Sequence, residues 1–252
     1  MDKNILAELR KKKWYLHSPP AVKNELKDLP LEFHGFLADL AKRKSFIGRV
    51  EILRLLKILR GNYLIIPVFE VRSLDTNEVF TYEFVSWKFG RFPGYKGIIL
   101  VEVKGRIKYF IVKYGAKFPI GADCYDSIGT FYSPDNLKKT ITVPNKIKNH
   151  LRKFLGLPQV HFKKFIDLGI LNPDPGMSNN HIDLFAVVID DDNAQKIDEL
   201  LAHNPQKSLV LGYELEIVPV TQLHDFIKRC NDGFFLACIA RLFSQKVLEI
   251  SG

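Results

Sequence analysis

The sequence contains few cysteines and no long hydrophobic run. Its 252 residues include three cysteines, Cys124, Cys230 and Cys238, which form neither a disulfide framework nor a CxxC metal-binding pattern. No apolar stretch approaches the roughly 18 residues that a membrane-spanning helix requires. The N-terminal segment MDKNILAELRKKKWY has its basic residues after the first apolar ones, the reverse of a secretory signal. We therefore expect a cytoplasmic protein with no membrane partner.

Acidic residues are outnumbered by basic ones. The chain has 37 Lys and Arg against 28 Asp and Glu, a formal net charge of +9, and a pI near 9.3. Such a basic protein is expected to meet an anionic partner, which can be nucleic acid, a phosphorylated metabolite or an acidic surface. A solvated lysine-rich surface is the alternative explanation. The hydrophobic content of 46% is enough for a full core in one large domain, with or without an extension.

The spacing of apolar residues changes near residue 61. Apolar residues three and four apart in NILAELRKKKWYL, PLEFHGFLADLAKRK and RVEILRLLKILRG predict helices, with a break at SPP and a stop at Gly61. After Asn62, β-branched and aromatic residues predict strands in NYLIIPVFEV, VFTYEFVSW, KGIILVEVKG and RIKYFIVKYG. Lys104-Gly105 lies where a tight hairpin turn is expected.

The second half of the chain adds a helix, strands and a terminal helix. Pro144 can start a helix that ends near Gly156. HFKKFIDLGILNPDPGMSNNHIDLFAVVID predicts a strand, a Pro-Gly turn and a strand. AQKIDELLAHN and GYELEIVPV follow, and TQLHDFIKRCNDGFFLACIARLFSQKVLEI predicts one closing helix. This order predicts an α+β sandwich with a sheet between helices.

The order of these segments resembles the Nudix superfamily, especially its ADP-ribose pyrophosphatase branch. In that branch a hairpin, a Gly-containing turn, the Nudix helix, a Pro-Gly turn and an E-I-x-V strand follow one another. The matching segments are KGIILVEVKGRIKYFIVKYGAKFP, YDSIG, LRKFLGL, LGILNPDPGMSNNHIDLFAVV and LEIVPVTQLHDFIKR. The resemblance implies a Nudix-like α/β/α sandwich with a mixed sheet over residues 95–252. Residues 1–94 would form an N-terminal helical region with extra strands.

The Nudix box itself is degenerate. In the pattern Gx5Ex7REUxEExGU, with U a bulky apolar residue, glutamates on one helix face converge on Mg²⁺, which bridges a diphosphate. Counted back from Gly156-Leu157, the Arg and Glu positions of the box carry Asn149, His150, Lys153, Phe154 and Ile141. Between Thr130 and Ile166 the single acid is Asp135, against eight lysines and arginines. The resemblance therefore implies the fold without Mg²⁺-dependent hydrolysis, and we predict no metal site and no cofactor.

A second resemblance, to the nucleotide-sugar 2,3-dehydratases, extends further toward the N-terminus. Those enzymes are built from Nudix-like units that lack the box. FLADLAKRKSFIGRVEILRLLKILRGNYLIIPVFEV, Trp87, the hairpin, GTFY and TQLHDFIKR look like one such unit. The dehydratases carry two units per chain and glutamine-rich substrate motifs that are absent here. This resemblance implies a nucleotide-type ligand and no catalytic residue.

Six residues are candidates for ligand binding. Lys113 and Lys117 lie where Nudix diphosphatases tend to place a basic residue toward phosphate, although strand-end lysines are often simply exposed. The remaining candidates are loop and helix residues: Arg91 beside the aromatic residues of FGRFPGY, Arg152 and Lys153 on the basic helix, and Asn180 in the Pro-Gly turn. Aromatic residues with an arginine can stack a base, but they can also cover a core edge.

Three functions remain open. The first is a non-hydrolytic Nudix-fold protein that binds a nucleotide, a nucleotide sugar or another phosphorylated small molecule. The second is an enzyme like the nucleotide-sugar 2,3-dehydratases, and the third is a basic module that binds nucleic acid or protein.

A homodimer is also expected. Nudix relatives with an N-terminal extension commonly dimerise through it, and the apolar segments ILAEL and VEILRLLKIL offer a surface. The alternative is that both segments pack on their own sheet.

Overall fold

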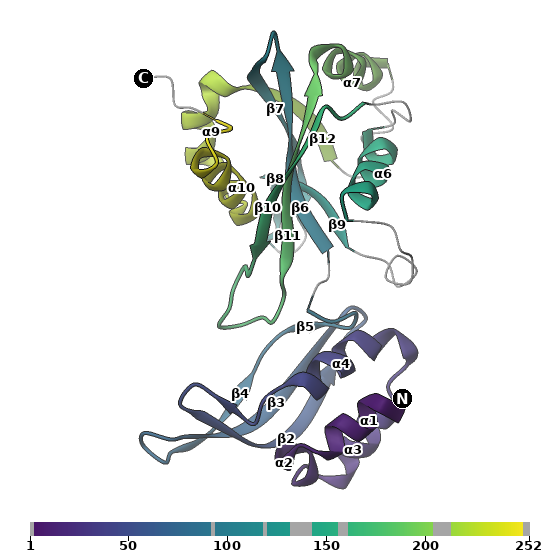
Figure 1. Cartoon of the computed structure of the whole chain (residues 1–252), viewed down its shortest axis with the longest axis vertical. Helices are drawn as coiled ribbons and strands as arrows, with labels where there is room; N and C mark the ends of the chain where they lie inside the picture. The colour runs from purple at the N-terminus through teal and green to yellow at the C-terminus, as the bar shows by residue number, and fades with distance from the viewer. Residues whose placement is uncertain are drawn as a thin grey trace. The chain divides into compact units, whose positions relative to one another are not determined.

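The chain forms two compact units. The computed structural model describes residues 3–91, 94–117, 120–131, 143–155, 161–203 and 213–248. The N-terminal unit contains residues 1–93 together with 172–181, and the C-terminal unit contains residues 94–171 and 182–252. Figure 1 shows both units and the loop of residues 172–181, which joins two strands of the C-terminal unit. A segment that lies between two strands of the C-terminal unit thus belongs by its contacts to the N-terminal unit.

The N-terminal unit has helices on one face of an antiparallel sheet (Figure 1). The helices are α1 (Lys3–Arg10), α2 (Lys13–Leu16), α3 (Pro20–Lys27), η1 (Leu31–Phe33) and α4 (His34–Lys42). The strands are β1 (Phe46–Ile47), β2 (Val50–Arg60), β3 (Leu64–Ser73), β4 (Val79–Glu83) and β5 (Ser86–Trp87). The sheet order is β1-β2-β3-β4, and β5 also pairs with β3. Trp14 and Leu37 from the helices share one buried core with Leu55 and Phe69 from the strands.

The prediction of a helix in RVEILRLLKILRG is wrong, because residues 50–60 form strand β2. The register of β2 against β3 shifts twice, immediately after Ile52 and immediately after Leu55. Each shift is a β-bulge that adds one residue to β2 and reverses the alternation of its side chains. The buried residues Ile52, Leu55 and Ile58 are therefore three apart, which is the spacing that predicted a helix.

The C-terminal unit is built on a mixed sheet. Its strands are β6 (Gly94–Val103), β7 (Arg106–Lys117), β8 (Ala122–Asp126), β9 (Ile128–Phe131), β10 (Lys164–Leu171), β11 (Ile182–Asp190) and β12 (Tyr213–Pro219). The order is β10-β11-β6-β7-β12, with β8 paired to β7 and β9 paired to β6. The β11–β6 pair is parallel and the other pairs are antiparallel. Lys104 and Gly105 join β6 to β7 with positive φ angles of 49° and 79°, which confirms the predicted hairpin turn.

Helices cover both faces of this sheet (Figure 1). They are α6 (Val143–Leu155), α7 (Asp191–His203), η3 (Val220–Gln222), α9 (Leu223–Arg229) and α10 (Gly233–Ser244). Ile98 and Leu100 of β6 pack with α9 and α10, whereas Ile99 and Val101 pack with α6 and α7. The predicted α+β sandwich with a mixed sheet between helices is confirmed. In the described ranges, no helix is both long and apolar enough to cross a membrane.

The closing helix is divided in two, contrary to the prediction of one helix. Helix α9 ends at Arg229, and α10 begins at Gly233. Asp232 stands between them in an extended conformation, and its carboxylate accepts hydrogen bonds from the main-chain N–H groups of Phe234 and Phe235. An aspartate in this role is a strong helix start, so the chain begins a new helix there.

Candidate functional site

Helix α6 occupies the predicted position of the Nudix helix. Its residues Ile147 and Leu151 are fully buried against the sheet. On other sides of the helix Asn149 is exposed, and the Arg152 guanidinium lies 5.7 Å from the centre of the Phe162 ring. Arg152 also donates to the Asn149 side-chain oxygen over 3.1 Å. The apolar side of α6 therefore packs as expected of a Nudix helix.

The described residues of α6 do not fit a Mg²⁺ site. They offer an amide at Asn149, an imidazole at His150 and a guanidinium at Arg152, whereas Mg²⁺ prefers carboxylate and other oxygen ligands. Within the described ranges, no group of three or more His, Cys, Asp and Glu is arranged to hold a metal ion. Ile141 and the side chains of Lys153 and Phe154 lie outside the described residues. We therefore derive no metal-dependent step for this helix.

Three lysines converge on one buried carboxylate in the C-terminal unit. Lys96 Nζ lies 2.8 Å from Asp126 Oδ1, and Lys113 Nζ lies 2.8 Å from Asp126 Oδ2. Lys117 Nζ also bonds to Asp126 Oδ2. We call these four residues the Asp126 cluster. Its three positive charges exceed its negative charge by two.

The cluster lies where the sheet divides. Strands β6 and β7 pair near their hairpin, from the Ile99–Ile111 pair to the turn. Further from the turn, β7 pairs with β8 and β6 pairs with β9. The β8–β9 connection at Ser127 therefore lies between β6 and β7, where these two strands no longer pair with each other. Asp126 is the last residue of β8 and sits opposite Lys113. The next residue, Ser127, donates its main-chain N–H to the Asp232 carboxylate at the start of α10 over 2.6 Å. The fold thus holds the carboxylate at the point of division.

Burial and charge act in opposite directions on these groups. Burial disfavours the ionised form of Asp126, but Lys96 and Lys113 together with the lysine hydrogen bonds outweigh it and hold the pKa of Asp126 well below its usual value. Burial also lowers the pKa of Lys113, an effect that the neighbouring Asp126 partly offsets. The Lys117 side chain is 35% exposed, so part of the positive charge faces solvent. Solvent reaches Lys117 more than Lys113, whose side chain is 11% exposed.

The structure brings two of the predicted ligand residues together and separates the others. Lys113 and Lys117 meet in the Asp126 cluster, whereas Arg152 instead contacts Asn149 and Phe162 on α6. Sequence reasoning missed Lys96 and Asp126. The available signal for Asp126 was its place in YDSIG, beside the glycine turn. Lys96 carries no such signal, because only the pairing of β6 with β9 places it beside Asp126.

Arg91 and Asn180 belong to the N-terminal unit. The Arg91 guanidinium pairs with Asp39 at 3.5 Å, and the Arg91 main-chain N–H donates to the same carboxylate. The Arg91 carbonyl accepts from the main-chain N–H of His181 over 2.6 Å. The Asn180 N–H donates to Ser178 Oγ over 3.1 Å. Arg91 therefore helps to attach residues 172–181 to the rest of this unit through His181, whereas the Asn180 contact lies within that segment.

Comparisons with known proteins support the fold and leave the family undefined. No protein-family model matches the sequence, and no curated protein matches it. A crystal structure of an ADP compounds hydrolase aligns with a TM-score of 0.53 and 11% sequence identity, over 82% of this chain and 98% of that chain. This chain has a Nudix-like fold. At such low identity the likeness extends to the fold alone.

Proposed function

We propose that this protein binds a phosphorylated small molecule, such as a nucleotide or a nucleotide sugar, and does not hydrolyse it. The observation that supports the proposal best is the Asp126 cluster, with two positive charges more than its carboxylate neutralises. Lysine ammonium groups bind phosphate as point charges, and partial burial strengthens that interaction relative to bulk water. Lys113 and Lys117 also lie where Nudix diphosphatases tend to place a basic residue toward phosphate.

The described residues of helix α6 lack the metal ligands of the usual Nudix reaction, so we do not propose that reaction for this protein. That reaction needs a divalent cation next to the diphosphate, held by several carboxylates. Asn149, His150 and Arg152 supply none. We therefore expect the ligand to bind with its phosphates on Lys96, Lys113 and Lys117 and to dissociate without being hydrolysed.

Titration calorimetry at low salt tests binding, with ADP and UDP-glucose as probes. The informative variant is Lys117→Gln, because this lysine is the most exposed of the three and its loss disturbs packing least. A hydrogen bond to a charged group contributes about 1.5–3 kcal/mol. We therefore expect the variant to bind about tenfold to a hundredfold more weakly than the wild type.

Lys163→Gln is the matched control. Lys163 is a partly exposed lysine of the same unit, and it pairs with Glu102 at 2.8 Å. This variant should bind both probes as the wild type does. The absence of saturable binding to either probe, or equal losses in the two variants, would contradict the proposal.

Product analysis tests the non-hydrolytic part. ADP-ribose and UDP-glucose are incubated with the protein and Mg²⁺, and chromatography should recover both unchanged. Release of a nucleoside monophosphate that depends on the protein would overturn this part of the proposal.

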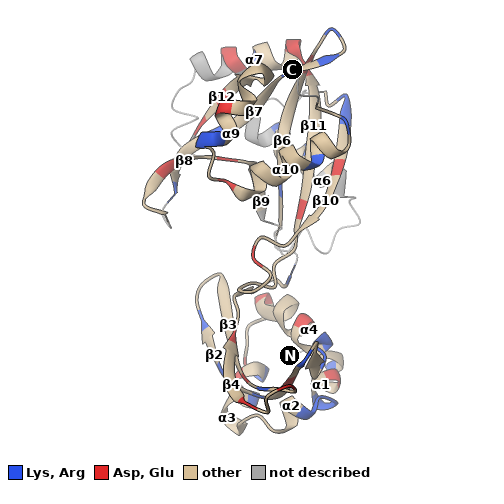
Figure 2. Ribbon diagram, turned by 90° about the vertical axis from the view of Figure 1, so that its left-hand side faces the viewer, with Lys and Arg blue, Asp and Glu red and all other residues tan. Residues whose placement is uncertain are grey.

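The two alternative functions can be tested with the same protein. An elimination product from a 4-keto nucleotide sugar would favour the dehydratase-like enzyme. Binding of oligonucleotides with a steep salt dependence would favour the nucleic-acid module. Figure 2 shows Lys and Arg on both units, interspersed with Asp and Glu. The basic face of such a module would be the lysine-rich stretch of residues 138–164, of which residues 138–142 and 156–160 lie outside the described residues.

We also propose a homodimer. Ile5 and Leu9 of ILAEL and Ile52 of VEILRLLKIL are buried in the core of their own unit, so these residues do not supply an interface. The exposed apolar side chains of this unit include Phe46 on β1 and Val79 on β4. Multi-angle light scattering should give twice the chain mass of 29.0 kDa, and a monomer mass would end the proposal.

A further inference from the structure

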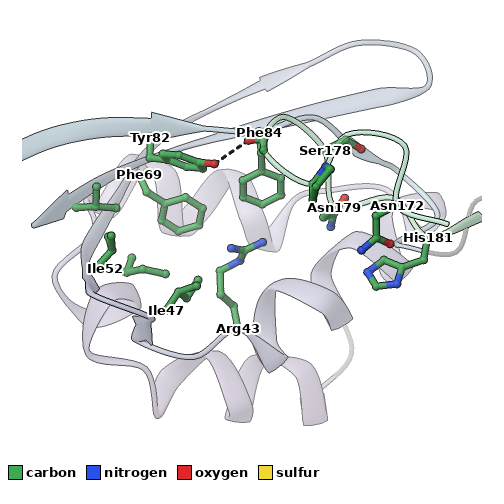
Figure 3. Close-up of a pocket in the computed structure, with 14 residues that line it drawn as sticks. Arg43, Ile47, Ile52, Phe69, Tyr82, Phe84, Asn172, Ser178, Asn179 and His181 are labelled. Carbon is green, nitrogen blue, oxygen red and sulfur yellow. Dashed lines mark hydrogen bonds between the residues drawn. The ribbon is translucent and has the colours of Figure 1, made fainter. Parts of the chain in front are cut away.

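The N-terminal unit contains a cavity that is separate from the Asp126 cluster. Its volume is about 380 Å³, within the range of roughly 300–1,000 Å³ typical of small-molecule sites. Figure 3 shows its lining, in which apolar side chains lie toward one end and polar side chains of residues 172–181 toward the other. All the lining residues belong to this one unit.

Arg43 is the positive group of this cavity. It follows α4 directly, in an extended conformation that ends the helix. Its guanidinium carbon lies 4.2 Å from the centre of the Phe84 ring and 5.8 Å from that of Phe69. These rings cover the flat face of the guanidinium, and its hydrogen-bond donors lie around the edge. The Arg43 guanidinium makes no hydrogen bond or ion pair with any described residue.

One carboxylate, that of Asp39, lies near both Arg43 and Arg91. Asp39 accepts the main-chain N–H of Arg91 and pairs with the Arg91 guanidinium. Burial lowers the pKa of Arg43, and Arg91 lowers it further, whereas Asp39 and Tyr82 act in the opposite direction. An arginine stays charged in a protein despite such a shift. Two guanidinium groups thus share one carboxylate, which leaves a single positive charge to be balanced.

Residues 172–181 form a fixed polar wall. The Tyr82 hydroxyl donates to the Gly176 carbonyl over 2.7 Å, the Val85 N–H donates to the Met177 carbonyl over 2.8 Å, and the Asn179 N–H donates to the Val85 carbonyl over 3.2 Å. Asn179 Oδ1 is buried and has no hydrogen-bond partner among the described residues. A buried amide oxygen without a hydrogen-bond partner costs free energy unless water or a ligand donates a hydrogen bond to it.

We propose that this cavity binds a small aromatic carboxylic acid. Its carboxylate pairs with the edge of the Arg43 guanidinium, and its ring lies against Ile52 and Phe69. A donor on the ring, such as a hydroxyl or an N–H, reaches Asn179. One unbalanced positive charge suits a singly charged carboxylate better than a doubly charged phosphate. This site does not depend on the function proposed for the C-terminal unit.

The test uses 2-naphthoate as the probe and 2-naphthamide as its neutral isostere. Titration calorimetry on the full chain should show saturable binding of 2-naphthoate and at least about tenfold weaker binding of the amide. Arg43→Gln should weaken 2-naphthoate binding by about tenfold or more, while 2-naphthamide binding changes little. Arg54→Gln is the control, because Arg54 is an exposed arginine of the same unit that already pairs with Glu70 at 2.9 Å.

Asn179→Asp keeps the proposal testable if Arg43→Gln does not fold. This loop substitution adds a negative charge to the cavity wall and should also lower 2-naphthoate affinity by about tenfold. Lys117→Gln, in the other unit, should leave 2-naphthoate binding unchanged, so the two proposed sites fail or succeed independently. The proposal is overturned if 2-naphthoate shows no saturable binding, if the amide binds equally well, or if neither cavity variant weakens binding.

Discussion

Replacing Asp126 with asparagine would remove the single negative charge from among three lysines. The Asp126 side chain is only 7% exposed, and all three lysine nitrogens contact its carboxylate. Asparagine has nearly the same shape, so the change is almost purely one of charge. We predict that Asp126→Asn destabilises the protein and at the same time strengthens its binding of phosphate groups.

The loss of stability follows from the burial of the cluster. Removing one partner of a buried ion pair typically costs about 3–5 kcal/mol, because the other charge remains buried without compensation. Water can reach Lys96 and Lys117, whose side chains are 23% and 35% exposed, so the lower end of this range applies. A loss of about 3 kcal/mol corresponds to a fall in melting temperature of roughly 6–12 °C for a chain of this size.

The gain in affinity has the same origin. The net charge of the cluster rises from two positive charges to three, and a bound phosphate no longer competes with the carboxylate for the lysines. ADP should therefore bind Asp126→Asn more tightly than the wild type, by about tenfold. Stability and affinity change in opposite directions, which a simple loss of folding cannot produce.

Chemical unfolding and calorimetry with ADP together measure both effects. Asp225→Asn is the control, because Asp225 is an exposed residue of the same unit that pairs with Lys228, and its loss should leave the stability nearly unchanged. A cost below about 1 kcal/mol for Asp126→Asn as well would show that the lysines are fully hydrated and would refute the reasoning. Weaker binding of ADP by a folded Asp126→Asn would refute the assignment of these lysines to phosphate.

The pH dependence of the unfolding free energy provides a second test of the effect of Asp126 on stability. The pKa of Asp126 is lower in the folded state than in the unfolded state. Its contribution to stability is therefore complete above the unfolded pKa, near 4, and is lost as the pH falls from there toward the folded pKa. The difference in unfolding free energy between the wild type and Asp126→Asn should shrink as the pH falls below about 4. A difference that stays constant across this range would contradict the shift.

Three further substitutions, two tests and one control, concern the packing. Gly97→Ala would place a Cβ 2.4 Å from the carbonyl oxygen of Phe185 on the adjacent strand, so it should lower the unfolding free energy by about 2 kcal/mol or more. Gly233→Ala is the control, because the new Cβ would lie in open space and the change should be neutral or stabilising. Ser18→Ala removes the buried hydroxyl that accepts the N–H of Leu55 over 3.0 Å in the bulged strand β2, and urea unfolding should show a loss of about 1–3 kcal/mol. A loss below about 0.5 kcal/mol in Gly97→Ala or Ser18→Ala would mean that the site relaxes around the change.

Local patterns predicted much of the C-terminal unit correctly. The hairpin at Lys104-Gly105 depends on two adjacent residues that adopt positive φ, and helix α6 depends on a proline start and an apolar face. Each of these two signals is contained in one short stretch of the sequence. The absence of carboxylates along α6 is also visible in the sequence alone, and it remains the main argument against metal-dependent hydrolysis.

Long-range pairing decided the features that the sequence analysis missed. Strand β2 is a strand because β3 pairs with it through two bulges, and no local pattern distinguishes its buried spacing of three from a helix. The candidate site shows the same limit. Lys113 and Lys117 lie on one strand, but their contact with Asp126 beside Lys96 depends on the division of the sheet between β6 and β7.

The sequence by itself determined the charge, the apolar framework and the missing metal ligands, because these follow from residue type and short spacing. Only the tertiary structure decided which charges are compensated. Asp126 neutralises one of three lysines, and Asp39 contacts Arg91 while the Arg43 guanidinium faces the cavity without a carboxylate partner among the described residues. Coulomb interactions depend on distance and burial, and both are set by residues far apart in the chain.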